Sequence, residues 1–366
     1  MSIFSDFTII GSGINGLLTA RELIKTGATV TLIEKNQLSK EASWAGGGIL
    51  LPIYPWRQAQ AITKLVKISI KIYPELNTEL LSHTGIDPEW TQCGLLITKN
   101  PDLTLAEAWC KRNLIACLPG TEAQLKAFHS NALNPIWLPE IAQVRNPRLL
   151  TALIQDLKSK KAIFHEHCSL NKAQLTHNRI ESITTNHGKI AVNQLILTTG
   201  AWTGELWQDL FSTSQTNPPE IHPVKGQMLL FDAQPGLLAH MILDNDRYLI
   251  PRRDGKILAG STVETSGFDK QVTSDAKQQL YNFATRLFPA LAEYPVTHHW
   301  AGLRPGTQQG IPYIDKHPEI ENLYINAGHF RNGLVMGPAS AKLLTELIMN
   351  QPTSIDPTPY QLSAQH

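Results

Sequence analysis

The sequence predicts an α/β protein with a nucleotide-binding sheet built from both ends of the chain and an antiparallel β-sheet domain inserted between them. Three observations lead to this prediction. A strand, a glycine-rich turn, a helix and a second strand follow one another in residues 7–35. Residues 219–264 alternate apolar and polar positions with a period of two, and residues 323–349 form a strand, a glycine-bounded loop and a helix.

Composition indicates a globular protein that can bury a large core, since 42% of its 366 residues are hydrophobic and 17% are charged. The formal charge is +1, without long runs of either sign, which argues against a nucleic acid or an anionic membrane as partner. The start, MSIFSDFTII, lacks the basic segment of a signal peptide, and no apolar run reaches the roughly 18 residues that span a bilayer. We therefore expect a cytoplasmic protein.

The cysteines and histidines do not predict a metal site. No C-x-x-C pair and no histidine-rich ligand spacing occurs, which fits reduced thiols better than disulfides or zinc. We expect His298, His299 and the HEH of residues 165–167 to lie at solvent-facing strand positions. The four cysteines are Cys93, Cys110, Cys117 and Cys168.

The first motif is G-x-G-x-x-G, formed by Gly11, Gly13 and Gly16 between a strand and a helix. Gly11 permits the tight turn, Gly13 lets the backbone approach a pyrophosphate, and Gly16 allows close packing of helix and strand. Glu34 ends the second strand, where a carboxylate can accept hydrogen bonds from both ribose hydroxyls and would repel a 2′-phosphate. The motif predicts a Rossmann-like domain for FAD or NAD rather than NADP, and leaves the choice between FAD and NAD open.

Further elements extend this domain. Residues 59–85 have the periodicity of an amphipathic helix. A second helix is expected over residues 146–162, capped by Asn146 with Pro147 in its first turn. The buried strand QLILTTG ends at Gly200, which could let the chain pass close to the adenosine half of the ligand. The last helix is expected to begin near Pro338.

Six ordered segments resemble the FAD-dependent D-amino-acid oxidase superfamily, and most closely its glycine oxidase branch, which is associated with thiamine biosynthesis. The likeness extends from residue 9 to residue 341. The segments are IIGSGINGLLTARELIKTGATVTLIEK, SWAGGGIL, HPVKGQML, YLIPRRDGKILAGST, WAGLRPGT and NAGHFRNGLVMGPASA.

The resemblance implies a discontinuous FAD-binding domain and an inserted substrate domain, and it suggests a homo-oligomer. The FAD-binding domain would comprise residues 1–80, 145–215 and 310–366, and the substrate domain residues 81–144 and 216–309. No cysteine follows Cys168, so the covalent flavin link of the monomeric sarcosine oxidases is not available and FAD is expected to be non-covalent. Cys168 and Ser169 depart from the valine that relatives usually place beside the adenine.

The glycines of SWAGGGIL are expected to let the backbone pass flush against the isoalloxazine ring. By resemblance, Ile49 falls beside the substrate pocket, and the helix near Pro338 directs its positive end at the flavin. The residues expected to contact FAD are Gly11, Gly13, Ile14, Asn15, Gly16, Glu34, Lys35, Ala42, Ser43, Gly46, Gly47, Gly48, Ile49, Gly200, His329, Phe330, Asn332, Gly333 and Leu334.

Three residues are expected at the substrate site, with Arg331 contributing through its side chain or its backbone. By resemblance, Arg304 binds the substrate carboxylate, because a guanidinium fork matches two carboxylate oxygens. Arg331 would line the site, and Tyr248 would present its phenol from the central sheet. We expect Arg252 and Arg253 to be ordinary sheet-edge charges, and no general base is required if the neutral amine reacts.

These residues predict an oxidase that converts glycine, another small amine or a D-amino acid to its imine and then to a 2-oxo acid and ammonia, with oxygen becoming hydrogen peroxide. In thiamine biosynthesis the imine would feed thiazole formation. One alternative is a D-amino-acid dehydrogenase that passes electrons to a quinone or other acceptor. Another is a flavin-binding module without turnover, which would not need the three substrate residues. The LPIYPW loop either packs at the domain interface or narrows the entrance through Tyr54 or Trp56.

Overall fold

The computed structural model describes residues 5–99, 101–129, 132, 134–211, 214 and 216–364. Residues 1–4, which belong to the N-terminal segment expected to lack a signal peptide, lie outside the described residues. A six-stranded sheet forms one half of the molecule, with five parallel strands and an antiparallel edge strand, β18. Its order is β18 (Tyr313–Lys316), β19 (Leu323–Ala327), β12 (Gln194–Leu197), β1 (Phe7–Ile10), β2 (Val30–Ile33) and β8 (Ile163–His165).

Helices cover one face of this sheet, and a small antiparallel sheet with α7 (Thr203–Phe211) covers the other. Neighbouring residues of β1 face opposite layers, since Ile9 packs among the helices and Ile10 packs with the small sheet. The helical layer contains α1 (Ile14–Lys25), α3 (Gln60–Thr84), α6 (Asn146–Ser159) and α9 (Gly333–Ile348). The small sheet contains β9 (Leu170–Thr176), β10 (Arg179–Thr185) and β11 (Gly188–Ala191).

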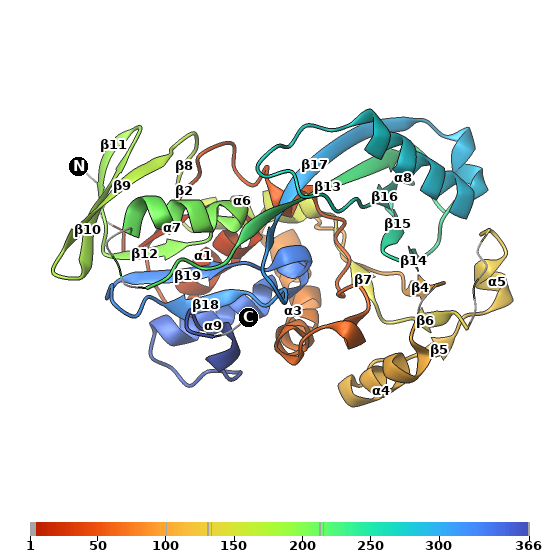
Figure 1. The fold of residues 1–366 in the computed structure, drawn as a ribbon, viewed down its shortest axis with the longest axis horizontal. Coiled ribbons are helices and arrows are strands. Elements are labelled where there is room, and N and C mark those ends of the chain that lie inside the picture. The colour runs from red at the N-terminus through yellow and green to blue at the C-terminus, as the bar shows by residue number, and fades with distance from the viewer. Residues whose placement is uncertain are drawn as a thin grey trace.

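An eight-stranded sheet forms the other half of the molecule, to the right in Figure 1. Its strands pair in antiparallel fashion, except that β4 and β14 run parallel. The prediction of an antiparallel sheet therefore fails at this one pair. The order is β17 (Val296–Gly306), β13 (His222–Phe231), β16 (Ile257–Gly260), β15 (Arg247–Pro251), β14 (Met241–Asp244), β4 (Leu95–Ile97), β6 (Ile136–Leu138) and β5 (Leu118–Pro119).

The α/β class with an additional, largely antiparallel sheet is confirmed, while the exact division into two domains stays a prediction. The long strands β13 and β17 run from the eight-stranded sheet toward the parallel sheet (Figure 1). Strands β3 (Thr91–Gln92) and β7 (Ala142–Gln143) pair to form a separate two-stranded antiparallel sheet. The remaining α-helices are α2 (Ala42–Ala45), α4 (Leu103–Asn113), α5 (Glu122–Leu125) and α8 (Ser274–Leu287).

The last helix begins earlier than expected. It starts at Gly333, so Pro338 lies inside α9 rather than in its first turn. A proline has no N–H for the carbonyl four residues before it, which is that of Leu334. The buried Tyr73 of α3 donates its hydroxyl to this carbonyl at 2.6 Å, and this bond explains how the helix accommodates the proline.

The cap predicted for α6 is also wrong. Arg145 is the N-cap, and Asn146 is the first residue of the helix. The Asn146 side chain does not cap its own helix, because its amide donates to the Ser43 carbonyl at 2.7 Å. It thereby ties α6 to the segment that carries the three consecutive glycines.

Candidate functional site

A cavity of about 370 Å³ lies between the parallel sheet and the eight-stranded sheet. The carboxyl ends of β1, β2, β12 and β19 open into it from one side, as expected for a ligand site in a parallel sheet. Strands β13, β15 and β17 contribute residues from the other side. All residues predicted to contact cofactor or substrate line this cavity except Gly16.

The glycines of the first motif are required by close packing. Gly11 has φ +102°, and a Cβ there would lie 2.6 Å from the Thr198 carbonyl oxygen. A Cβ on Gly16 would meet the Thr198 side chain at 2.7 Å, which accounts for this glycine without a ligand contact. Gly13 precedes the first turn of α1, which contains no acidic residue and therefore presents N–H groups and a positive dipole end to the cavity.

Glu34 lies at the end of the cavity reached by β2. It is buried, and its carboxylate accepts hydrogen bonds from Ser12 N at 3.0 Å, Ser12 Oγ at 2.9 Å and Asn36 N at 3.1 Å. A carboxylate has about four acceptor positions, so capacity remains for a ligand hydroxyl. Cys168 and Ser169 line the cavity close by, where Cys168 N donates to the Glu34 carbonyl at 2.8 Å.

Trp202 also lines this end of the cavity, and nothing in the sequence indicated it beyond the nearby Gly200. Trp202 follows Gly200 in a short 3-10 helix, and the Lys35 ammonium lies 3.6 Å from its ring centroid. Burial lowers the pKa of Lys35. Phe268 stacks on Trp202 with ring centroids 5.6 Å apart, so a loop of the eight-stranded half contacts the parallel-sheet half.

The three consecutive glycines, Gly46, Gly47 and Gly48, pass between α6 and the eight-stranded sheet. A Cβ on Gly47 would lie 2.7 Å from Ile250 Cδ1 and 3.1 Å from Tyr248 Cε2. Gly48 has φ +87°, a conformation that favours glycine. The segment therefore has no room for side chains, and Tyr248 packs directly against it.

Arg304 of β17 lies partly buried beside Tyr248. Its guanidinium donates to Ser261 Oγ at 2.8 Å and to the carbonyls of Thr262 and Lys225 at 3.2 and 3.3 Å. Burial lowers the pKa of Arg304, and the positive charge of Arg331 lowers it further. The two guanidinium groups thus lie near one another in a single cavity.

Gly226 makes room for Arg304, a role that the sequence analysis missed. A Cβ on this β13 residue would lie closer than 3.0 Å to both terminal nitrogens of Arg304. The available signal was a glycine inside a strand pattern, which often marks close approach of another group. Ser261 was missed as well, because its contact with Arg304 joins positions far apart in the sequence.

Two of the residues predicted to contact substrate or cofactor carry buried polar atoms that have no hydrogen-bond partner among the described residues. They are Arg331 Nε, a donor, and Asn15 Oδ1, an acceptor, and both residues line the cavity. Such atoms are normally satisfied, so they point to a ligand or solvent with complementary groups. The glycine cradles, the positive end of α1, Glu34 and these atoms all fit an adenine dinucleotide with a flavin.

His329 connects two of the helices that begin at the cavity, α1 and α9. It is fully buried, and burial lowers its pKa to about 3, so the ring is neutral. Its Nδ1 accepts from Asn15 Nδ2 at 3.1 Å, which leaves the proton on Nε2, 3.0 Å from Ser340 Oγ. The ring therefore joins the first turn of α1 to α9, whose start at Gly333 borders the cavity.

Arg252 is not a sheet-edge charge. Only 8% of it is exposed, and its guanidinium donates to the carbonyls of Gly47 at 2.8 Å and Val144 at 3.0 Å. By contrast, the neighbouring Arg253 is exposed and pairs with Asp87 at 2.6 Å. The sequence does not distinguish the two arginines, because they are adjacent and follow the same strand.

Neither aromatic residue of the LPIYPW loop lines the cavity. Tyr54 is buried, and its hydroxyl donates to the carbonyls of Lys99 and Asn245 at 2.8 and 2.6 Å. Trp56 packs on the same hydrophobic cluster. The loop therefore packs on the eight-stranded half of the molecule, and Leu51 and Ile53 rather than the aromatic residues border the cavity.

Among the described residues, no three His, Cys, Asp or Glu side chains converge as metal ligands. All four cysteines are free. Within the described ranges, none of the helices has both the length and the apolar character needed to cross a bilayer.

Comparison with known proteins identifies the class. The family model for FAD-dependent oxidoreductases of the DAO family matches residues 6–347, so the chain belongs to this family and is a flavin-dependent oxidoreductase that uses FAD. The expected family resemblance is thereby confirmed.

Individual relatives narrow the comparison. The chain is 41% identical over 357 residues to glycine oxidase of Pseudomonas aeruginosa, covering 96% of this chain and 97% of that protein. The crystal structure of glycine oxidase from Geobacillus kaustophilus superposes with a TM-score of 0.92 at 25% identity, covering 99% of each chain. A protein of Synechocystis named bifunctional protein ThiO/ThiG is 29% identical over 97% of this chain and 53% of its own length.

Proposed function

We propose that the protein oxidises glycine, and other small amines or D-amino acids, to the imine, with oxygen as the final electron acceptor. The imine hydrolyses to the 2-oxo acid and ammonia, and oxygen is reduced to hydrogen peroxide. The similarity to glycine oxidases supports this substrate class. We further propose that the imine supplies thiazole formation in thiamine synthesis, which the likeness to a protein named ThiO/ThiG supports.

One observation carries the proposal: Arg304, Arg331 and Tyr248 line the same cavity as the three consecutive glycines. We propose that Arg304 binds the substrate carboxylate with its planar fork, and that Arg331 and Tyr248 complete the pocket for this anion. This arrangement would direct the α-carbon toward the glycine segment. The apolar side chains of Ile49 and Met228 would exclude water from the reacting carbon.

The chain would hold FAD, without a covalent link, along the predicted contacts from Glu34 to Leu334. When bound, FAD supplies the acceptor for the hydride that leaves the α-carbon. The neutral substrate amine needs no protein base, and the neutral His329 cannot repel the positive charge that develops on the substrate as it becomes an imine. The start of α9 would favour reduction, because its positive dipole end stabilises negative charge.

A substrate panel tests the proposal. Purified protein is mixed with glycine, sarcosine, D-alanine and D-proline, and peroxide release in air is compared with dye reduction without oxygen. Peroxide formation with glycine is the expected result. Rapid dye reduction without peroxide would refute oxygen as the acceptor, and no reaction with glycine by either readout would refute the substrate assignment.

A further inference from the structure

Arg252 is a buried cation whose hydrogen bonds all go to neutral groups. Its Nη2 donates to Gly47 O at 2.8 Å, and its Nη1 donates to Val144 O at 3.0 Å and to Gln143 Oε1. In the part of the chain that the structure describes, no carboxylate oxygen lies within the 4.0 Å of an ion pair. Burial lowers its pKa to about 10, which still leaves it charged at neutral pH.

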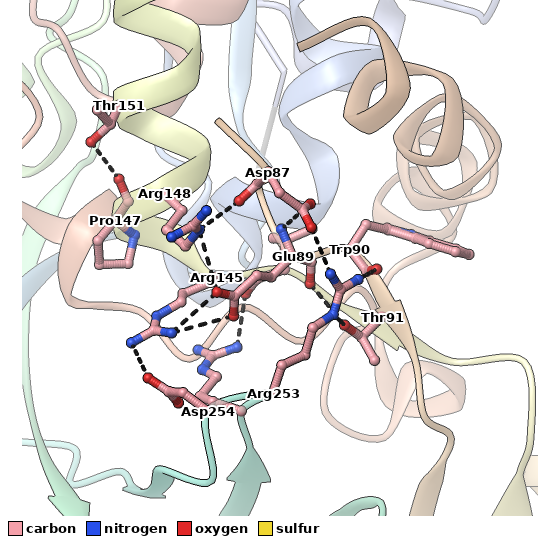
Figure 2. Close-up of polar contacts among 12 residues, drawn as sticks. Asp87, Glu89, Trp90, Thr91, Arg145, Pro147, Arg148, Thr151, Arg253 and Asp254 are labelled. Atoms are coloured by element: carbon pink, nitrogen blue, oxygen red, sulfur yellow. Dashed lines mark hydrogen bonds and ion pairs between the residues drawn. The ribbon is translucent and has the colours of Figure 1, made fainter. Parts of the chain in front are cut away.

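Arg252 differs in this respect from the arginines that surround it. The surrounding arginines all have acidic partners, as the close-up in Figure 2 shows. Burying a charge without an opposite charge is costly unless its hydrogen-bond acceptors are well placed. The pairs are Arg145 with Glu89 and Asp254, Arg148 with Glu89, and Arg253 with Asp87.

Arg252 binds where a backbone ladder ends. Leu50 N donates to Ala142 O at 2.9 Å, and Val144 N donates to Gly48 O at 2.9 Å. Beside these two bonds, the guanidinium binds one carbonyl of each segment, that of Gly47 and that of Val144. A single planar fork therefore joins Gly47 to Val144 in place of further backbone hydrogen bonds.

The carbonyl that Arg252 binds at Gly47 belongs to the Gly47–Gly48 peptide. A trans peptide is planar, so the Gly48 N–H points away from the Gly47 carbonyl and hence away from Arg252. Among the described residues no hydrogen bond of this N–H is found, and Gly48 lines the cavity. A peptide between two glycines has few conformational restraints of its own, so its orientation must come from such contacts.

We propose that Arg252 is a positioning residue for the flavin: it fixes the Gly47–Gly48 peptide so that the Gly48 N–H remains available to a hydrogen-bond acceptor of FAD. The inference rests on the proposed placement of FAD along this cavity. Lysine cannot replace arginine in this role, because one ammonium on a flexible stem does not hold two carbonyls in a fixed relation. The role therefore depends on the guanidinium fork and not on the charge alone.

The test compares Arg252→Lys and Arg252→Met with a matched control, Arg253→Met. Arg253 follows the same strand and donates to Asp87, Thr91 and the Trp90 carbonyl, but it contacts none of the three consecutive glycines. For each protein we would measure the visible circular dichroism of the bound flavin. Titration of FAD into apoprotein gives the dissociation constant, and the melting temperature of the apoprotein reports on stability.

Both Arg252 variants are expected to change the flavin dichroism alike and to raise the FAD dissociation constant at least about tenfold, as for the loss of a charge-assisted hydrogen bond. Arg253→Met should match the wild type in both. The inference is overturned if Arg252→Lys keeps the wild-type dichroism and dissociation constant, because charge alone would then suffice. It is also overturned if Arg253→Met produces the same changes.

Two further outcomes are decisive. If Arg252→Met does not fold, Arg252→Lys alone decides, since it keeps the charge and most of the side-chain volume. A purely structural role would lower the melting temperature of the apoprotein and leave the flavin dichroism unchanged, which overturns the inference. Failure of the wild-type protein to oxidise glycine would refute the proposed substrate and leave this inference standing, because its readouts need no substrate.

Discussion

Gly226→Ala should impair the proposed substrate pocket, although the substitution replaces no charged residue. The added Cβ would come closer than 3.0 Å to the Arg304 guanidinium, so the guanidinium must move. In moving it gives up its bond to Ser261 Oγ and its bonds to the carbonyls of Thr262 and Lys225. We expect the displaced guanidinium to lose one charge-assisted hydrogen bond to the substrate carboxylate, which is worth about 1.5–3 kcal/mol, so kcat/KM for glycine should fall about 10- to 150-fold.

Steady-state peroxide kinetics over a range of glycine concentrations measure this effect, and a double-mutant cycle isolates its cause. If Gly226 acts only by housing Arg304, Gly226→Ala should have little further effect in an Arg304→Ala background. An unchanged kcat/KM in the single variant would refute the reasoning. So would an equal loss in both backgrounds, because the glycine would then act on the sheet and not on the arginine.

Two predictions concern stability. Tyr73→Phe leaves the Leu334 carbonyl unpaired beside Pro338 and should lower the unfolding free energy by about 1–3 kcal/mol. Pro338→Ala in the Tyr73→Phe background should recover part of this loss by restoring the helix N–H, as denaturant unfolding would show, and no recovery would contradict our account of α9. Asp156→Asn should destabilise the helical layer by about 3–5 kcal/mol, because Asp156 is buried and binds Arg21, His83 and Lys160. Burial alone would raise the pKa of Asp156, but these partners lower it below its usual value. The ionised carboxylate therefore stabilises the folded wild-type protein, and this contribution is lost as the pH falls below about 4. The melting temperature of Asp156→Asn should therefore depend less on pH in that range, and an equal slope in both proteins would rule out this role.

The nucleotide half of the fold was predictable because its determinants are local. A glycine at a positive φ, a helix beginning directly after it and a buried strand ending in an acid all lie within one stretch of the chain, from Gly11 to Glu34. The residues that we propose to bind substrate could be named only through family resemblance. In the structure, Arg304, Tyr248 and Arg331 converge on the cavity from three separate segments.

What the sequence did not reveal depends on contacts between distant segments. Arg252 and Arg253 are adjacent and identical in type, yet one points to Gly47 and the other to Asp87. Pro338 suggested a helix start because the compensating hydroxyl of Tyr73 comes from another helix. In both cases the prediction was wrong, because a partner more than 100 residues away in the sequence determined the outcome.

The charges of the cavity bear on the choice between an amino acid and a simple amine as substrate. Among the described residues neither Arg304 nor Arg331 forms an ion pair, and the Arg331 Nε has no hydrogen-bond acceptor. Burial lowers the pKa of Arg304, and the positive charge of the neighbouring Arg331 lowers it further, because two guanidinium groups repel one another. An incoming carboxylate would relieve this repulsion, whereas a cationic amine without a carboxylate would add to it. The site therefore favours substrates that carry their own negative charge, and methylamine should be a far poorer substrate than glycine although both present an oxidisable C–N bond.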